Sequence, residues 1–425
     1  NGLTTDQVTI TRFDGLATAN AGPDQSVCSV PGIATLAANA PLAPTTGSWS
    51  VVSGTATITT PGSPNTGVTG LGPGTVILQW SISNGPCGAP STDQMTITVF
   101  DANAVAANAG PDQQLCVPNT STTLAGNTPT SPATGTWSVV SGSATITTPG
   151  SPTSGVSNLG IGTNVLRWTM NNGACANPAS VDDVIITVYD NAQANANAGP
   201  DQEACSTLPV ATLTGNAANA PATGQWSLVS GSGTIATPGS SSTIVSNMGT
   251  GANVFKWTVT NGVCGTTDDQ VTVLVFDVAN PVANAGADQT LCTPNTSTVM
   301  AGSSLIFPAT GTWELVSGQG IIADAASPVT AISGLGVGTN VFRWSVYNGP
   351  CNGTTTDEMI ITVFDGALVV PGAGPDQSIC LPTFPNLVSM AAGPVAPPAI
   401  GTWTLISGSA TFADVNDPNT EVSGL

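Results

Sequence analysis

Thr75-Val-Ile-Leu-Gln-Trp-Ser-Ile82 is the most regular segment of the sequence, and it decides the fold class. Its large apolar side chains fall on every second residue, so that Val76, Leu78, Trp80 and Ile82 share one face. A period of two is typical of a β-strand that buries one face. The segment therefore predicts a half-buried strand, and Cys87 follows seven residues after its tryptophan.

Cysteine and tryptophan recur along the chain with a period close to 88 residues. Successive first cysteines are separated by 88, 89, 87 and 88 residues, and a second cysteine follows the first four after 59 residues. The first cysteines are Cys28, Cys116, Cys205, Cys292 and Cys380; the second cysteines are Cys87, Cys175, Cys264 and Cys351. Tryptophan precedes each second cysteine by seven residues, at Trp80, Trp168, Trp257 and Trp344. A fixed period of this kind indicates a tandem array of similar units.

The composition suits many short strands better than long helices. The 425 residues include 49 Gly and 33 Pro, and only 7% are charged. Glycine and proline are poor helix formers but are frequent in the turns between strands. In the first repeat, strands are expected at 33–37, 47–53, 56–60, 75–82 and 93–100, with a weak strand in 67–74. Roughly seven short strands per unit predict an all-β, Ig-like (PKD-like) β-sandwich with Greek-key connections.

The period divides the chain into six parts, which we expect to form an extended rod. Residues 1–15 are expected to be the last strand of a preceding repeat, because 5–14 match 92–101. Complete Ig-like repeats are expected at 16–103, 104–192, 193–279 and 280–367, and a truncated repeat at 368–425. Cys380 would need a partner near position 439, so the sequence predicts a longer array.

One disulfide is expected in each repeat, between its first and second cysteine. The expected pairs are Cys28 with Cys87, Cys116 with Cys175, Cys205 with Cys264, and Cys292 with Cys351. Each bond would close a loop of about 60 residues, which the chain-entropy model equates with about 4 kcal/mol. Metal or redox cysteines are disfavoured, because the chain has no Cys-x-x-Cys and no histidine. This use of cysteine predicts an oxidising, extracellular compartment.

The charge balance excludes several classes of function. Acidic residues number 24 and basic residues 4, which gives a net charge of −20. A sequence-independent nucleic-acid binder needs a basic track, and no apolar run is long enough for direct membrane insertion. Without histidine, and with its few glutamates at unrelated repeat positions, the chain lacks the usual acid and base groups of an enzyme. We therefore expect no catalytic activity.

The tryptophans allow two interpretations. They could form an aromatic platform on which sugars stack, or they could fill the core. Each lies inside a strand and is flanked by alternating apolar residues, so the core is favoured. One tryptophan is then expected from each of the two sheets of a repeat.

Aspartate recurs at three positions of the repeat: before the last strand, at its end, and in the opening turn of the next unit. The last two positions and a nearby asparagine flank each junction, and oxygen ligands of this kind suit Ca²⁺. The candidate calcium sites are Asp101, Asn108 and Asp112; Asp190, Asn197 and Asp201; and Asp277, Asn284 and Asp288. Alternatively, the aspartates cap turns by hydrogen bonds to the backbone. We favour capping, because no dense Asp-x-Asp-x-Asp loop is present.

Four motifs carry a resemblance to a known family. They are Ala21-Gly-Pro-Asp-Gln25 at the start of a repeat, Leu-Ala/Gly-Asn in its second strand, Gly-Thr-Trp in its third strand and Val-Phe-Asp at its end. They resemble the PKD-like and Ig-like repeats of giant surface proteins of gliding Bacteroidota, the gliding-motility adhesins of the SprB type. The Trp-Asp-Phe-Gly-Asp-Gly motif of ordinary PKD modules is replaced here by Gly47-Ser-Trp-Ser-Val-Val-Ser-Gly54. The resemblance implies type IX secretion and display as an outer-membrane-attached filament at the cell surface.

Together, these patterns predict a structural or adhesive segment of a long cell-surface filament, and the resemblance points to gliding motility or surface attachment. Its neighbours would be further repeats of the same chain, and regions outside this segment would bind a surface, a polysaccharide or other cells. Two alternatives are a non-catalytic module array of a secreted polysaccharide-active enzyme and a self-assembling extracellular filament or sheath subunit.

Overall fold

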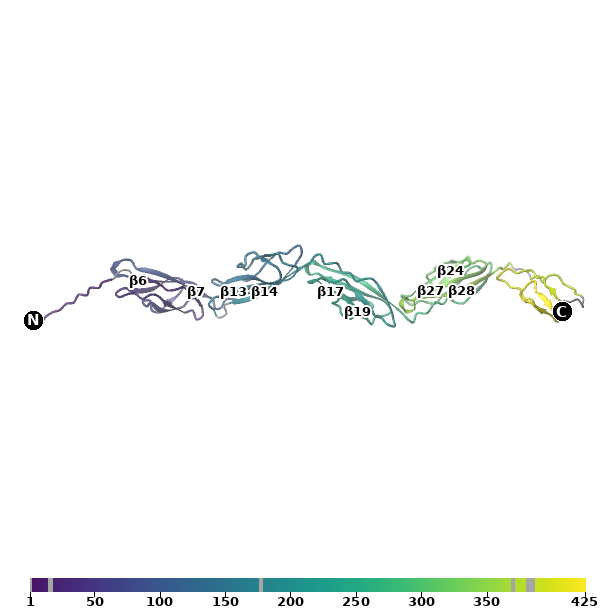
Figure 1. Cartoon of the computed structure of the whole chain (residues 1–425), viewed down its shortest axis with the longest axis horizontal. Helices are drawn as coiled ribbons and strands as arrows, with labels where there is room; N and C mark the ends of the chain where they lie inside the picture. Colours follow the sequence, from purple (N-terminus) through teal and green to yellow (C-terminus); the bar gives the residue numbers. More distant parts are fainter. Residues whose placement is uncertain (1, 14–17, 176–178, 368–370, 380–386) are drawn as a thin grey trace. The chain divides into compact units, whose positions relative to one another are not determined.

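The computed structural model describes residues 2–13, 18–175, 179–367, 371–379 and 387–425, and β-strands dominate it (Figure 1). The strands form pairs of sheets that recur with the period of the sequence. The prediction of an all-β chain of tandem Ig-like sandwiches is confirmed. In the described part of the chain, no helix combines the length and the hydropathy that a membrane span requires.

The first sandwich shows the arrangement that the later ones repeat. One sheet contains β1 (Gln25–Cys28), β7 (Ser91–Phe100), β6 (Gly74–Ser83) and β3 (Thr46–Ser53), in that order. The other sheet contains β2 (Ala34–Ala37), β5 (Asn65–Thr69) and β4 (Thr57–Ile58). The β1–β7 pair is parallel, whereas the other pairs are antiparallel. Strand β1 was not expected, and β5 begins and ends before the weak strand expected in 67–74. The other strands match the expected segments to within two residues at each end.

The next three sandwiches keep this order. The second has β8 (Gln113–Cys116), β14 (Ala179–Tyr189), β13 (Gly162–Asn171) and β10 (Thr134–Ser141) in one sheet, and β9 (Thr122–Thr123), β12 (Gly155–Ser157) and β11 (Thr145–Ile146) in the other. The third has β15 (Gln202–Cys205), β21 (Thr266–Phe276), β20 (Gly251–Thr260) and β17 (Thr223–Ser230), with β16 (Ala211–Thr214), β19 (Ser242–Ser246) and β18 (Thr234–Ile235). The fourth has β22 (Gln289–Cys292), β28 (Thr354–Phe364), β27 (Gly338–Tyr347) and β24 (Thr310–Ser317), with β23 (Thr298–Ala301), β26 (Val329–Ser333) and β25 (Ile321–Ile322).

The remaining elements are short. After the fourth sandwich, β29 (Val388–Ser389), β31 (Glu421–Ser423) and β30 (Thr411–Phe412) form a small sheet. Short helices carry or adjoin second cysteines in three repeats: η1 (Gly85–Cys87), η2 (Gly262–Cys264) and α1 (Gly349–Asn352).

The first strand of each sandwich was missed by the sequence prediction. Gln25–Cys28 has only four residues and follows directly after the turn at Gly22–Asp24, so it lacks a visible alternation. Its parallel pairing sets Cys28 beside Phe100, the last residue of β7. This register fixes which end of the sandwich carries the first cysteine.

The tryptophans of the first four repeats lie in the core, as predicted. Trp49 and Trp80 are almost fully buried, and their ring centroids are 5.2 Å apart. The expectation that they come from two different sheets is wrong: they face each other across the neighbouring strands β3 and β6. In the second, third and fourth repeats the equivalent centroids are 5.0, 5.1 and 5.1 Å apart.

A glycine lies against the second tryptophan of each of these repeats. A Cβ atom at Gly135 would overlap the six-membered ring of Trp168. The counterparts of Gly135 are Gly47, Gly224 and Gly311, which lie against Trp80, Trp257 and Trp344. The Gly-x-Trp motif of the third strand thus makes room for the partner tryptophan on the neighbouring strand.

Arg167, Lys256 and Arg343 form ion pairs on the exposed side of their sheets. Arg167 contacts Asp183 at 2.7 Å, Lys256 contacts Asp268 at 3.3 Å, and Arg343 contacts glutamates rather than an aspartate. The Arg167 guanidinium donates a hydrogen bond that lowers the pKa of Asp183. The three basic residues occupy one position of the repeat, where the first repeat has Gln79 beside Gln94.

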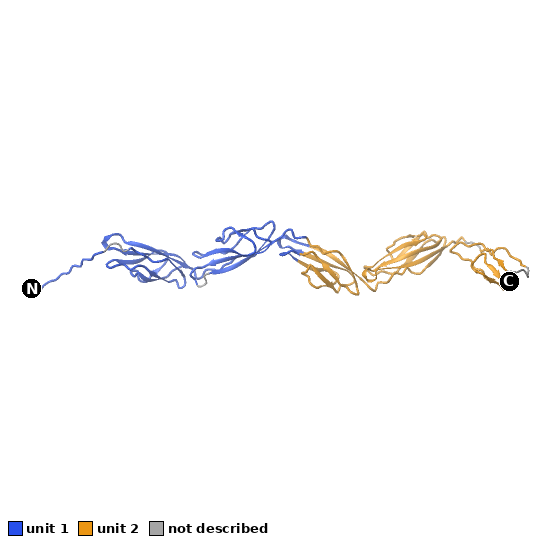
Figure 2. Ribbon diagram, viewed as in Figure 1, with its two compact units in different colours: residues 1–194, 218–223, 259–267 blue, residues 195–217, 224–258, 268–425 orange. Residues whose placement is uncertain are grey.

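The chain divides into two compact units, coloured separately in Figure 2. The first contains residues 1–194, 218–223 and 259–267, and the second contains the others. The division passes through the third repeat, because its segments 218–223 and 259–267 belong to the first unit. Cys264 lies in the second of these segments and is bonded to Cys116 of the same unit.

Gly135→Ala is expected to lower the free energy of unfolding of the second repeat by about 1–3 kcal/mol, because the added methyl group overpacks the core. Gly150→Ala is the control, since a Cβ atom there would meet nothing within 4 Å. Thermal unfolding followed by tryptophan fluorescence measures both. Equal melting temperatures for the two variants would contradict this account of the motif.

Candidate functional site: a disulfide clamp between repeats

Each disulfide in the described residues joins one repeat to the next. The bonds are Cys28–Cys175, Cys116–Cys264 and Cys205–Cys351, with sequence separations of 147, 148 and 146 residues. Their Cα–Cα distances are 4.7, 5.2 and 5.0 Å. The predicted pairing of the two cysteines within a repeat is therefore wrong. The first cysteine of each repeat instead bonds to the second cysteine of the following repeat.

The strand register explains the correction. Cys28 lies beside Phe100 at the end of β7, whereas Cys87 precedes Ser91 at the start of the same strand. Ten residues of strand span about 30 Å, and a disulfide requires Cα atoms within about 7 Å. The two cysteines of one repeat thus lie at opposite ends of the sandwich and cannot meet.

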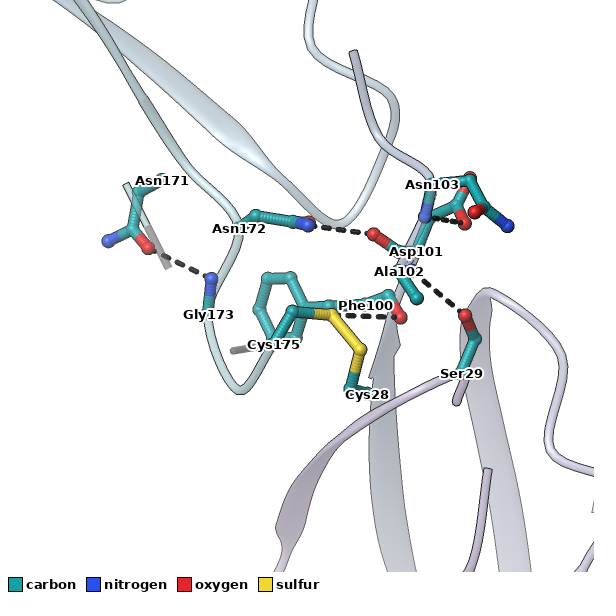
Figure 3. Close-up of a disulfide and its surroundings, with 10 residues drawn as sticks. All are labelled: Cys28, Ser29, Phe100, Asp101, Ala102, Asn103, Asn171, Asn172, Gly173 and Cys175. Atoms are coloured by element: carbon teal, nitrogen blue, oxygen red, sulfur yellow. Dashed lines mark hydrogen bonds between the residues drawn. A yellow bond between two sulfur atoms is a disulfide. The ribbon is translucent and has the colours of Figure 1, made fainter. Parts of the chain in front are cut away.

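Hydrogen bonds hold the loop that carries the second cysteine against the preceding repeat (Figure 3). The side-chain amide of Asn172 donates to the main-chain oxygen of Asp101 at 2.7 Å. The Gly173 amide donates to Asn171 Oδ1 at 2.9 Å, which shapes the loop. Cys175 Sγ lies 3.6 Å from the main-chain oxygen of Phe100. Polar contacts therefore position Cys175 independently of its bond to Cys28.

The asparagine contact recurs at the other two junctions. Asn261 donates to the main-chain oxygen of Asp190 at 2.7 Å, and Asn348 donates to that of Asp277 at 2.9 Å. Both asparagine side chains are buried. Each of these side chains thus satisfies its buried amide with the backbone carbonyl that directly follows the last strand of the preceding repeat.

A glycine lets the loop approach an aromatic ring of the preceding repeat. Gly173 has φ +51°, which favours glycine, and a Cβ atom there would overlap the ring of Phe100. The same arrangement is found for Gly262 (φ +50°) on Tyr189 and for Gly349 (φ +48°) on Phe276. We refer to the disulfide, the asparagine hydrogen bond and the glycine–aromatic contact together as the clamp.

The first cysteine also has a hydroxyl neighbour that binds the departing linker. Ser29 Oγ accepts a hydrogen bond from the Ala102 amide at 2.9 Å, and Ser206 Oγ accepts one from the Val278 amide at 2.9 Å. Thr293 Oγ1 accepts one from the Gly366 amide at 2.7 Å. The chain is therefore held on both sides as it leaves a sandwich.

The junction of the third and fourth repeats has an additional contact. The Tyr347 hydroxyl donates to Glu203 Oε2 at 2.6 Å, and its ring packs edge-on against Phe276 with centroids 5.8 Å apart. The hydrogen bond to the carboxylate raises the pKa of Tyr347, because it stabilises the protonated phenol. This contact adds a polar anchor beside the clamp.

Cys87 and Cys292 were predicted to form disulfides, but both are exposed free thiols. Cys87 nevertheless lies in half of a clamp. A Cβ atom at Gly85 would overlap the ring of Phe13, and Cys87 Sγ lies 3.9 Å from the main-chain oxygen of Phe13. Phe13 thus takes the place that Phe100 has in the next clamp. Cys380 lies outside the described residues.

The recurring aspartates act as acceptors for backbone amides. Asp112 Oδ1 accepts from Ile185 at 2.8 Å and Asp101 Oδ1 accepts from Asn103 at 2.9 Å. Asn108 Oδ1 accepts from Gly110 at 2.8 Å. The six counterparts at the later junctions bond in the same way: Asp190, Asn197, Asp201, Asp277, Asn284 and Asp288.

These bonds direct the candidate calcium ligands to different parts of the backbone. In the ranges that the structure describes, no three His, Cys, Asp or Glu side chains gather in a way that could hold a metal ion. The capping interpretation accounts for each of the nine side chains, and calcium binding by the asparagine and aspartate oxygens stays a prediction.

The stabilisation that a clamp contributes can be estimated from the length of the loop that its disulfide closes. A disulfide that closes about 147 residues stabilises the folded state by about 5 kcal/mol on the chain-entropy model, taken singly. Such bonds persist in oxidising compartments. The chemistry of this site is therefore covalent joining of consecutive domains.

Gly349→Ala is expected to hinder closure of the Cys205–Cys351 bond, because the methyl group would overlap Phe276. Gly353→Ala is the matched control in the same loop: its φ is also positive, at +63°, but a Cβ atom there meets nothing within 4 Å. Alkylation of free thiols before reduction, followed by mass spectrometry, should detect modified Cys205 and Cys351 in the first variant. Equal alkylation in both variants would show that the ring contact does not guide the bond.

On the capping account, the melting temperature should be the same in millimolar Ca²⁺ and in chelator. Calorimetry of the oxidised chain measures it, with Mg²⁺ as the control for ionic strength. A rise of several degrees specific to Ca²⁺ would instead support the calcium hypothesis.

No protein-family model and no curated protein matches the sequence. Several solved structures of multidomain fragments are similar at low identity. The I-band fragment from titin is 13% identical, with 61% of this chain and 99% of that chain covered and a TM-score of 0.32. The human desmocollin-1 ectodomain is 10% identical, with 95% and 92% covered and a TM-score of 0.24. A PKD domain is 28% identical over 24% of this chain and 96% of its own length, with a TM-score of 0.19.

Proposed function

We propose that this chain is a structural segment of an extracellular adhesive filament, in which the repeats hold a binding region away from the cell. The observation that carries the proposal is the clamp, present at three consecutive junctions. A flexible Gly/Ser linker would let domains move independently. A disulfide together with an asparagine hydrogen bond at each junction suits a spacer that keeps its reach under load.

The chemistry of the surface supports an extracellular location. A protein with several structural disulfides is typical of oxidising compartments, whereas the cytosol keeps cysteines reduced. The net charge of −20 keeps a long chain soluble through self-repulsion and discourages contact with nucleic acid and anionic lipid. The proposed partners are therefore a solid surface, a polysaccharide or other cells, bound through regions beyond these 425 residues.

The finer proposal is a gliding-motility or surface-attachment adhesin, secreted by the type IX route and attached to the outer membrane. It rests on the resemblance of the Ala-Gly-Pro-Asp-Gln, Gly-Thr-Trp and Val-Phe-Asp motifs to the repeats of such adhesins. An adhesin that is dragged across a surface is under tension, which is the condition that a covalent clamp withstands.

A second candidate, a self-assembling filament or sheath subunit, is favoured by one specific feature. Strand β3 forms an edge of its sheet and exposes two consecutive apolar side chains, Val51 (39% exposed) and Val52 (49%). Each later repeat exposes a similar pair: Val139 and Val140, Leu228 and Val229, Leu315 and Val316, and Leu405 and Ile406. Unpaired apolar edges favour association with another chain.

A module array that binds polysaccharide through its tryptophans has less support. The tryptophan pairs of the first four repeats are buried, so their faces cannot stack on a sugar ring. That alternative would need a different binding surface on the repeat.

Immunogold electron microscopy of intact producing cells tests the proposal. Antibodies against the second and fourth repeats should label filaments outside the cell, and deleting two repeats from the gene should bring the more distal label closer to the surface. Label confined to the cell interior, or label distances unchanged by the deletion, would contradict a spacer function. Sedimentation of the purified chain tests the second candidate. A self-assembling subunit should associate, and Val52→Lys should weaken this association.

A further inference from the structure

We infer that the three disulfides interleave into a covalent ladder, which keeps the array connected when a peptide bond is cut and limits its extension when a sandwich unfolds. The inference rests on the connectivity of the cysteines. It goes beyond the proposed function, because it holds whether or not the chain is an adhesin.

The three disulfide loops overlap along the sequence. They enclose residues 28–175, 116–264 and 205–351. Each loop begins before the previous one ends, so every peptide bond between Cys28 and Cys351 lies inside at least one loop. A single cut anywhere in this range therefore leaves both parts of the chain joined by a disulfide.

Bonds within each repeat would give a different result. Loops of about 60 residues would leave the linkers uncovered, and one cut between repeats would release a fragment. The linker near Val105 shows the difference, because it lies outside both 28–87 and 116–175 but inside 28–175. The linkers are exposed, and exposed linkers are the places where proteases cut most readily.

The ladder also limits how far the chain can stretch. The shortest covalent path from Cys28 to Cys351 crosses to Cys175, follows the chain to Cys205, and crosses again. Only about 30 residues of backbone lie on this path, and at about 3.3–3.6 Å per residue they span about 100–110 Å. The same two cysteines are about 320 residues apart along the backbone, which would span about 1,100 Å without the bonds.

The shortest covalent path runs through strands that are extended in the folded structure. The stretch from Cys175 to Cys205 contains β14 and β15, the last strand of one sandwich and the first of the next. Strands β13 and β10, which follow β14 in the order of its sheet, are outside the loaded path. Tension is therefore carried by the backbone of β14, the linker and β15 together with the sulfur atoms, and the other strands of the sandwiches need not resist it.

Cleavage of one linker tests the ladder. A protease recognition sequence inserted between Val105 and Ala106, both exposed, is cut after free thiols have been blocked. We expect a single species of full mass without reductant and two fragments with it. Two fragments without reductant would overturn the inference.

Two matched cysteine variants test whether the Cys28–Cys175 bond is the one that holds the cut chain together. In Cys28→Ser/Cys175→Ser the same cut should release two fragments without reductant, because no other disulfide among the described residues spans Val105. Cys87→Ser/Cys292→Ser removes the two free thiols and should leave the cut chain in one piece. Circular dichroism before cleavage establishes that both variants are folded. Release from the second pair as well would show that other bonds hold the chain.

Single-molecule pulling tests the limit on extension. With handles attached beside Cys28 and Cys351, the oxidised chain should not exceed about 110 Å between them, and adding reductant should permit steps of roughly 250–300 Å as each repeat of about 88 residues unfolds. Steps of that size in the oxidised chain would overturn the inference.

Discussion

The parallel pairing of β1 with β7 is the constraint on which the arrangement of the junctions depends. It sets Cys28 beside Phe100 at the end of the sandwich from which the chain leaves, while Cys87 stays at the end where the chain enters. Because each first cysteine lies at an exit and each second cysteine at an entrance, bonds can form only between consecutive repeats. The asparagine and glycine of the entrance loop then fit the carbonyl and the aromatic ring that end the preceding β7.

In this arrangement, different residues stabilise the individual repeats and join consecutive repeats. The tryptophan pairs and the glycines beneath them stabilise each repeat on its own. The clamps hold consecutive repeats together, with closed loops worth about 5 kcal/mol each when taken singly. The acidic side chains serve a third purpose, since those at the junctions cap backbone amides. A segment built in this way suits a spacer outside the cell better than an enzyme or a freely jointed chain.

Much of the fold could be predicted from the sequence, because its period and its alternation act locally. The alternation of Val76, Leu78, Trp80 and Ile82 defines β6, and the spacing of the tryptophans fixes the repeat. The disulfide pairing could not be predicted from spacing, since partners 59 and 147 residues apart are equally compatible with a period of 88. Strand β1 was missed because four residues carry no period, and only its register with β7 decides the pairing. A signal for the clamp was nevertheless present: an asparagine and a glycine precede each second cysteine in the loop, at Asn172 and Gly173 and at their counterparts.

Peptide mapping of the oxidised protein without reduction tests the central claim most directly. Free thiols are first alkylated at low pH, so that disulfides cannot exchange, and the digest is analysed by mass spectrometry. The account predicts cross-linked peptides that join Cys28 to Cys175, Cys116 to Cys264 and Cys205 to Cys351. Peptides that join Cys116 to Cys175 and Cys205 to Cys264, the two cysteines of a single repeat, would contradict it.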